Sequence, residues 1–199
     1  MTATTRTRLS PDERREQLLD LGVRLLGSRT IDELSIDLLA EEAGISRGLL
    51  YHYFGSKQGF HEAVVRHAAQ VLLEQTAPPK GGDPLERLLA SITAYVDYVI
   101  ANHAGYRSLV KAAAGGNDAL RRIYEETLAA IAERLFDEDA TGAFVKDTPT
   151  TRLVVRGWQA FAEELVLSWC EAASGVSKEQ LLQILTGSLP AVAATLPDS

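Results

Sequence analysis

The feature that most constrains the fold is the helical spacing of apolar residues along the chain. Leu18, Leu21, Leu25 and Leu26, for example, recur at the intervals that place them on one face of a helix. Similar stripes follow each glycine-containing or polar break, and no segment shows the convincing alternation that is typical of a strand. The sequence therefore predicts an all-α protein with about nine helices.

Capping residues indicate where these helices begin and end. Serine precedes several stripes at Ser10, Ser35, Ser46 and Ser177, and a serine can accept a hydrogen bond from the first free N–H groups of a helix. The predicted helices with both ends marked are 35–43, 57–75, 104–114, 118 to about 136 with Asp118 as its cap, and 148 to about 173. Pro190 is expected to kink or shorten the last helix, and 137–149 reads as a polar loop.

Composition narrows the class of protein. The 199 residues are 46% hydrophobic and 24% charged, as in an ordinary globular chain. We expect a cytoplasmic protein, because the single cysteine, Cys170, fits a reducing compartment and the N-terminus shows no apolar leader. We expect no membrane contact, because no apolar run approaches the length of a membrane helix. The net charge of −7 argues against nonspecific polyanion binding, so any nucleic-acid contact must come from a local patch.

Such a patch is suggested by two short helices joined at Gly44. Glycine tolerates the left-handed conformation of a sharp turn, and Ala40 is small enough for a close helix crossing. Leu50 would point inward, which leaves Arg47 and Tyr51 on the outer face. The stretch 44–57 contains no carboxylate, as expected of a helix that lies close to DNA phosphates. An alternative that stays open is that the tyrosines only pack on the protein surface.

Each candidate contact has a chemical reason. Arg47 can donate two hydrogen bonds to a guanine edge, Gly48 allows close backbone approach, and Leu49 can touch a thymine methyl group. The remaining candidates, which suit phosphate oxygens, are Ser35, Ser46, Tyr51 and Lys57.

The stretch SIDLLAEEAGISRGLLYHYFGSKQGFHEAV, Ser35–Val64, resembles the DNA-binding segment of TetR-family transcriptional regulators. The resemblance implies a three-helix DNA-binding head, a linking fourth helix and a helical body that binds a ligand and dimerises. It implies base contacts for Arg47, Leu49 and His52 and phosphate contacts for Tyr51 and Lys57, with Ser46 and Gly48 also at the DNA. Asp37 departs from the basic residue that some relatives carry. It could accept a hydrogen bond from a cytosine or point away from DNA, and we favour the second.

The resemblance and the single Pro- and Gly-rich break suggest a division of the chain. We expect a DNA-binding domain at 10–56, a connecting helix at 57–76, a boundary loop at 77–84 and a ligand-binding and dimerisation domain at 85–199.

The body is read from its own residues. Two apolar helices near the C-terminus could form a four-helix dimer interface with those of a second subunit. The residues expected there are Phe161, Leu165, Trp169, Leu182, Leu185 and Leu189. Aromatic and cationic residues that could line a ligand cavity are Tyr95, Tyr98, His103, Tyr106, Arg107, Lys111 and Trp158. An apolar or acyl-chain effector with an anionic head would suit Arg107 or Lys111, unless these cations are merely solvated and the aromatics are core.

Enzymatic chemistry is set aside. In HEAVVRH, His61–His67, the second histidine lies six positions after the first, whereas the helical zinc motif needs four. No cofactor or metal is expected. The sequence thus predicts a dimeric regulator, a repressor that binds a palindromic operator and is released by a small, largely apolar effector. The alternative is a helical small-molecule binder or enzyme with no DNA role.

Overall fold

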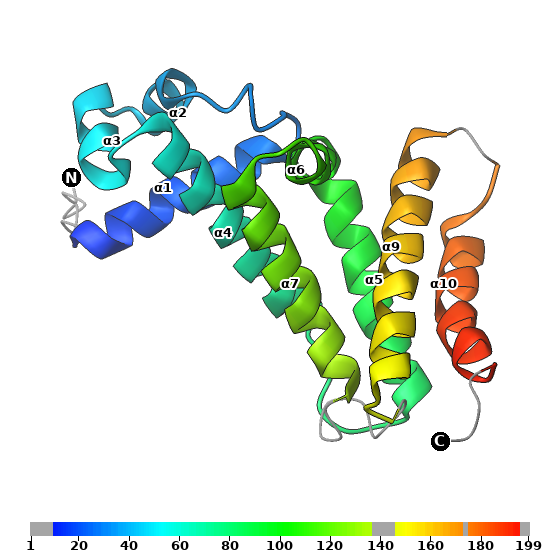
Figure 1. The fold of residues 1–199 in the computed structure, drawn as a ribbon. Coiled ribbons are helices and arrows are strands. Elements are labelled where there is room, and N and C mark those ends of the chain that lie inside the picture. Colours follow the sequence, from blue (N-terminus) through cyan, green and yellow to red (C-terminus); the bar gives the residue numbers. More distant parts are fainter. Residues whose placement is uncertain (1–9, 137–145, 173–174, 196–199) are drawn as a thin grey trace, which may run out of the picture.

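The computed structural model describes residues 10–136, 146–172 and 175–195, and all regular structure in these ranges is helical (Figure 1). The helices are α1 (Pro11–Leu26), α2 (Ile36–Ala43), α3 (Arg47–Phe54), α4 (Lys57–Gln75), α5 (Pro84–Ala101), α6 (His103–Ala114), α7 (Asp118–Phe136), α9 (Pro149–Glu171) and α10 (Lys178–Ala193). The predicted all-α class is confirmed. None of the described helices is both long and apolar enough to cross a membrane.

Most predicted helix boundaries are confirmed by their caps. Ser10 and Ser177 each form a capping box, in which the cap and the third helical residue bond to each other's backbone N–H. Asp118 is not the cap of α7, however. The carboxamide oxygen of Asn117 accepts from Leu120 N at 3.1 Å, which makes Asp118 a first-turn residue that pairs with Arg121.

The last two helices also differ slightly from expectation. Helix α9 ends at Glu171, and α10 continues through Pro190 to Ala193, so Pro190 does not end the helix. Proline lacks an N–H donor, but the next turn still closes because Ala194 N donates to Pro190 O at 2.9 Å. The predicted polar loop at 137–149 falls largely outside the described residues.

Two hydrophobic clusters organise the molecule, and α4 belongs to both. The first joins α1–α4 at one end of the molecule and includes Phe60 and Val64, which are both fully buried. The second joins α5, α9 and α10 at the other end, and Leu72 of α4 packs into it (Figure 1). One helix, α4, therefore carries side chains of both clusters.

Helix α6 and the start of α7 pack against the first cluster, although they follow the expected domain boundary. Leu120 and Ile123 of α7 are members of that cluster. At Gly105 of α6 a side-chain Cβ would lie 2.7 Å from both Cβ and O of Leu26, so glycine permits a close crossing with the end of α1. The hydroxyl of Ser108 also accepts from Ile31 N at 3.0 Å. These contacts join the parts of the chain before and after 77–84. The domain division at 77–84 therefore stays a prediction.

Candidate functional site

The two short helices form a tight helix-turn-helix. Gly44 adopts a left-handed conformation with φ of 64°, and Ile45 N donates to Ala40 O at 3.0 Å to close the turn. The Oγ atoms of Ser35 and Ser46 accept from Leu38 N at 3.1 Å and from Leu49 N at 3.3 Å. Both hydroxyls therefore cap their own helices, and each retains its O–H as a donor toward an oxygen outside.

Helix α3 has one buried face and one exposed face. Leu50 is fully buried and Phe54 is buried, so α3 is anchored through these two residues. The residues that lie opposite, Arg47, Gly48, Tyr51 and His52, are exposed, while Leu49 is partly buried. Helix α3 lies at the outer end of the molecule, beside α1 and α2 (Figure 1). Of the side chains that the sequence assigns to DNA, those of Arg47, Tyr51 and His52 on α3 are thus accessible.

Asp37 does not point away from this surface. Its Oδ1 lies 2.5 Å from Nε of Arg47, and both side chains are more than half exposed, at 58% and 68%. The expectation for Asp37 is therefore corrected: it sits on α2 beside the first residue of α3 and pairs with it. Sequence spacing could not show this, because the contact depends on the angle between the two helices.

Lys57 is the first residue of α4 and is exposed. Ser56 caps this helix by accepting from Gly59 N at 3.0 Å. The turn after α3 therefore leads directly into α4, and the Lys57 side chain lies at the end of α4 that is nearest to α3.

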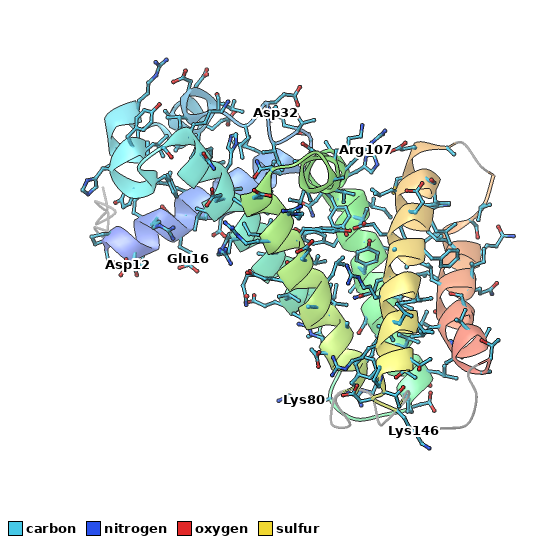
Figure 2. The ribbon with its side chains drawn as sticks, viewed as in Figure 1. Asp12, Glu16, Asp32, Lys80, Arg107 and Lys146 are labelled. Carbon is cyan, nitrogen blue, oxygen red and sulfur yellow. The ribbon has the colours of Figure 1, made fainter. Side chains whose placement is uncertain are left out.

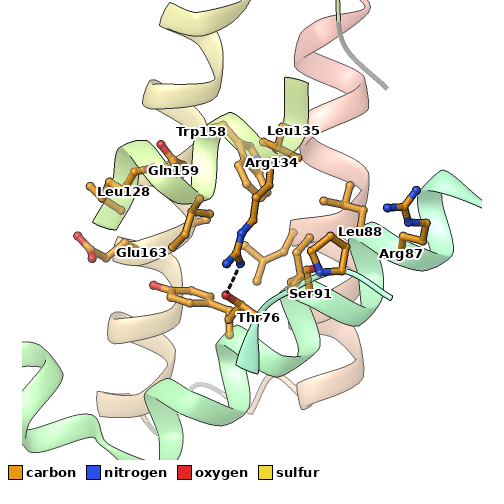
Figure 3. A pocket seen from close by; sticks show the side chains of 16 residues that line it. Thr76, Arg87, Leu88, Ser91, Leu128, Arg134, Leu135, Trp158, Gln159 and Glu163 are labelled. Carbon is orange, nitrogen blue, oxygen red and sulfur yellow. Dashed lines mark hydrogen bonds between the residues drawn. The ribbon is translucent and has the colours of Figure 1, made fainter. Parts of the chain in front are cut away.

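A cavity of about 110 Å³ lies in the body, among α5, α7, α9 and the end of α4 (Figure 3). Its lining is mostly apolar, with Leu88, Ile92, Leu128, Ile131, Leu135 and Leu185. Of the residues that the sequence assigned to a ligand, Tyr95 and Trp158 line it. The polar residues in the wall, Thr76, Arg87, Ser91, Arg134, Gln159 and Glu163, were not anticipated.

Glu163 is a buried carboxylate held by tyrosine hydroxyls. Its Oε1 accepts from Tyr106 OH at 2.7 Å and its Oε2 accepts from Tyr124 OH at 2.5 Å. Burial, together with the nearby Glu163 charge, raises the pKa of both phenols, so they remain neutral donors. Tyr95 joins the same network through Tyr106, with 3.1 Å between the hydroxyl oxygens. One sequence signal was available: Glu163 falls within the apolar stripe of α9.

Comparison with known proteins identifies the family. The model of the bacterial regulatory proteins of the tetR family matches residues 18–64, from within α1 to within α4. A crystal structure of a tetR-family transcriptional regulator from Streptomyces coelicolor superposes with a TM-score of 0.79 at 30% identity, covering 94% of this chain and 84% of that chain. The chain belongs to the TetR family of transcriptional regulators.

Curated TetR-family relatives match over a shorter region. The transcriptional activator FasR of Mycolicibacterium smegmatis is 32% identical over 102 residues, which are 50% of this chain and 47% of FasR. The regulator BetI of Burkholderia cenocepacia is 34% identical over 87 residues, which are 42% of this chain and 45% of BetI. The chain thus spans about half the length of the curated relatives it matches. A putative regulator from Pseudomonas aeruginosa, at 18% identity and a TM-score of 0.74, shows the fold alone.

Several residues that the sequence assigned to a ligand lie away from the cavity of about 110 Å³. Tyr98 and Tyr106 line a smaller neighbouring cavity. Arg107 forms an ion pair with Glu171 at the end of α9, and His103 Nε2 lies 3.8 Å from Glu171 Oε1. Figure 2 shows Arg107 beside that end of α9. Lys111 is exposed and lines neither cavity. Within this TetR-family body, the cations that reach the larger cavity are instead Arg87 and Arg134.

The residues assigned to a dimer interface divide into three groups. Phe161 is 46% exposed, and Leu153 of α9 and Ile184 of α10 are also exposed apolar residues. Leu165, Trp169 and Leu182 are partly buried against the protomer's own core. Leu185 and Leu189 have no exposed surface, which corrects their assignment because they cannot meet a second copy.

Proposed function

We propose that the protein is a transcriptional regulator that binds a DNA operator through α3. The carrying observation is the exposed face of α3, which presents Arg47, Gly48, Tyr51 and His52 opposite the buried Leu50. A helix that is anchored by one buried face and exposes the opposite face to solvent can enter a major groove. The tetR-family membership of the chain supports this proposal.

The proposed contacts follow the chemistry of each side chain. Arg47, Leu49 and His52 face base edges. Tyr51, Lys57, Ser35 and Ser46 hold phosphates, the two serines through hydroxyl hydrogens and the adjacent helix N-termini. These phosphate contacts have to overcome a chain net charge of −7, so binding depends on how closely the local surface fits the duplex.

We propose that two copies bind a palindromic operator. A dimer through α9 and α10 would cover exposed apolar side chains, of which Leu153 is 71% and Phe161 46% exposed. Its two α3 helices would enter successive major grooves, about 34 Å apart. The net negative charge of the chain supports this scheme. One copy makes few phosphate contacts, and a dimer on two half-sites doubles their number.

We propose repression that is relieved by a small, largely apolar effector in the cavity of the body. Thr76 follows α4 directly and lines the cavity, whereas Lys57 begins α4 at the DNA surface. An effector that binds more tightly to one position of α4 shifts the population toward it, by no more than that difference in affinity. A cytoplasmic location fits this role, since the operator is there.

Selection of bound duplexes from a random pool tests the function. We expect recovery of a palindrome whose half-sites are about one helical turn apart. A reporter gene placed behind that palindrome then gives the sign of regulation. Ligand binding by a protein that enriches no duplex at any salt concentration would overturn the proposal in favour of a small-molecule binder.

A further inference from the structure

Arg134 crosses the cavity from α7 and ends at α4. Figure 3 shows its guanidinium in the middle of the lining residues, hydrogen-bonded to Thr76. Its Nη1 donates to Thr76 Oγ1 at 3.2 Å and its Nη2 donates to Leu73 O at 2.6 Å. No ion pair within the described ranges involves Arg134.

The partners of Arg134 are neutral oxygens at the end of a helix. Leu73 O lies in the last turn of α4, where carbonyls carry partial negative charge, which explains why the guanidinium docks there. A carboxylate would be a stronger partner, because it carries a full charge and accepts two parallel hydrogen bonds from one guanidinium. The cavity therefore holds a cation whose strongest type of partner is not supplied by the described residues.

We propose that this cavity binds a monocarboxylate with an apolar body, whose carboxylate pairs with Arg134. The apolar body would pack on Leu88, Ile92, Leu128, Ile131, Leu135 and Leu185. Arg87 also lines the cavity, and its Nε donates to Pro79 O at 2.9 Å. The opposing carboxylate, Glu163, accepts from two tyrosine hydroxyls and points away from Arg134 in Figure 3.

The ligand and α4 compete for one guanidinium. A carboxylate that takes both Nη atoms displaces Leu73 O and Thr76 Oγ1, which removes two hydrogen bonds between the C-terminal end of α4 and α7. The opposite end of α4 carries Lys57. Binding of the carboxylate should therefore change the affinity for DNA through α4. This expected change rests on the proposed function, whereas binding of the carboxylate itself does not.

Three probes with one apolar body test the binding: 4-phenylbutyrate, 4-phenylbutanol and 4-phenylbutylamine. By titration calorimetry on the intact chain we expect 4-phenylbutyrate to bind at least about tenfold more tightly than the alcohol, with the amine weakest. Equal affinities, or tighter binding of the amine, would overturn the proposal. This ranking requires no variant.

Two substitutions locate the site. Arg134→Gln should abolish the preference for the carboxylate and leave the affinity for 4-phenylbutanol within about twofold. Arg122→Gln removes the same charge from an exposed position of α7 outside the cavity and should leave the ranking unchanged. A preference that survives Arg134→Gln, or that is lost equally in Arg122→Gln, would exclude Arg134 as the anchor.

Thr76→Val tests the competition with α4. It removes one acceptor of Arg134 while keeping the side-chain shape, so 4-phenylbutyrate should bind about threefold to tenfold more tightly. Weaker or unchanged binding contradicts the competition. Duplex binding is measured separately: a protein that binds an operator but does not prefer the carboxylate refutes this inference alone, and one that prefers the carboxylate but binds no duplex refutes the proposed function alone.

Discussion

Arg47 and Asp37 form an ion pair between α3 and α2, with 2.5 Å from Nε of the arginine to Oδ1 of the aspartate. The pair lies on the proposed DNA surface, where Arg47 is the first residue of α3. The carboxylate has two opposing effects: it orients the guanidinium, and it offsets the positive charge that phosphates would attract.

Asp37→Asn is expected to strengthen duplex binding by about twofold to fivefold, because an exposed ion pair contributes about 0.2–1 kcal/mol. The slope of log affinity against log salt should steepen by up to about one, because removal of the Asp37 carboxylate adds one net positive charge to the surface that faces the phosphates. Fluorescence anisotropy across a salt series measures both. Glu41→Gln removes the same charge from an exposed position of the same helix, and an equal gain there would mean a general charge effect.

Arg47→Ala and Lys57→Ala should weaken binding in different ways. Loss of Arg47 should cost about 1–3 kcal/mol and relax the preference at one base pair, whereas loss of Lys57 should weaken all sequences similarly. A gel-shift panel of single-base operator variants separates the two patterns. If neither substitution changes affinity, the assigned contacts are wrong.

Phe161→Asp should raise the dissociation constant of the dimer by at least about tenfold, because a charge would replace an exposed aromatic side chain at the proposed interface. Sedimentation velocity over a range of concentrations gives the constant. Leu89→Asp is the matched control, since Leu89 is 41% exposed but lies on α5. A chain that is monomeric at every concentration would remove the dimer proposal.

Gly105→Ala should destabilise the fold by about 1–3 kcal/mol, because the added Cβ would lie 2.7 Å from Leu26 Cβ and Leu26 O. Urea unfolding measures the free energy of unfolding. Gly48→Ala serves as a control, because its Cβ would meet nothing nearer than Ser46 Oγ at 4.0 Å. It should leave stability equal or raise it by up to about 1 kcal/mol.

Alkaline pH should destabilise the protein through its buried tyrosines. Burial raises the pKa of Tyr98 to about 12, whereas an unfolded tyrosine titrates near about 10. Below pH 10 both states keep the proton, and above it the unfolded state loses its proton first, so stability falls between about pH 10 and pH 12. For Tyr98 the difference is about 2–3 kcal/mol. Tyr98→Phe should make the decline in Tm over this range shallower, and an unchanged decline would contradict the assignment.

Local chemistry explains which parts of this protein could be read from the sequence. The serine caps and the Gly44 turn depend on contacts within about four residues, so they appear in the sequence as spacing. The burial of Leu50 and the exposure of Tyr51 follow in turn from the period of one short helix. The helix-turn-helix and its exposed candidates were therefore predictable.

Contacts between distant segments were decided by the tertiary structure alone. Arg134 meets Leu73 and Thr76 because α7 packs beside the end of α4, and Glu163 meets Tyr106 and Tyr124 because three helices converge. Leu185 and Phe161 are both large apolar residues in the apolar C-terminal helices, yet the first is buried and the second is exposed. Periodicity gives the angle between side chains on one helix, whereas the direction in which each face points depends on how that helix is rotated against its neighbours.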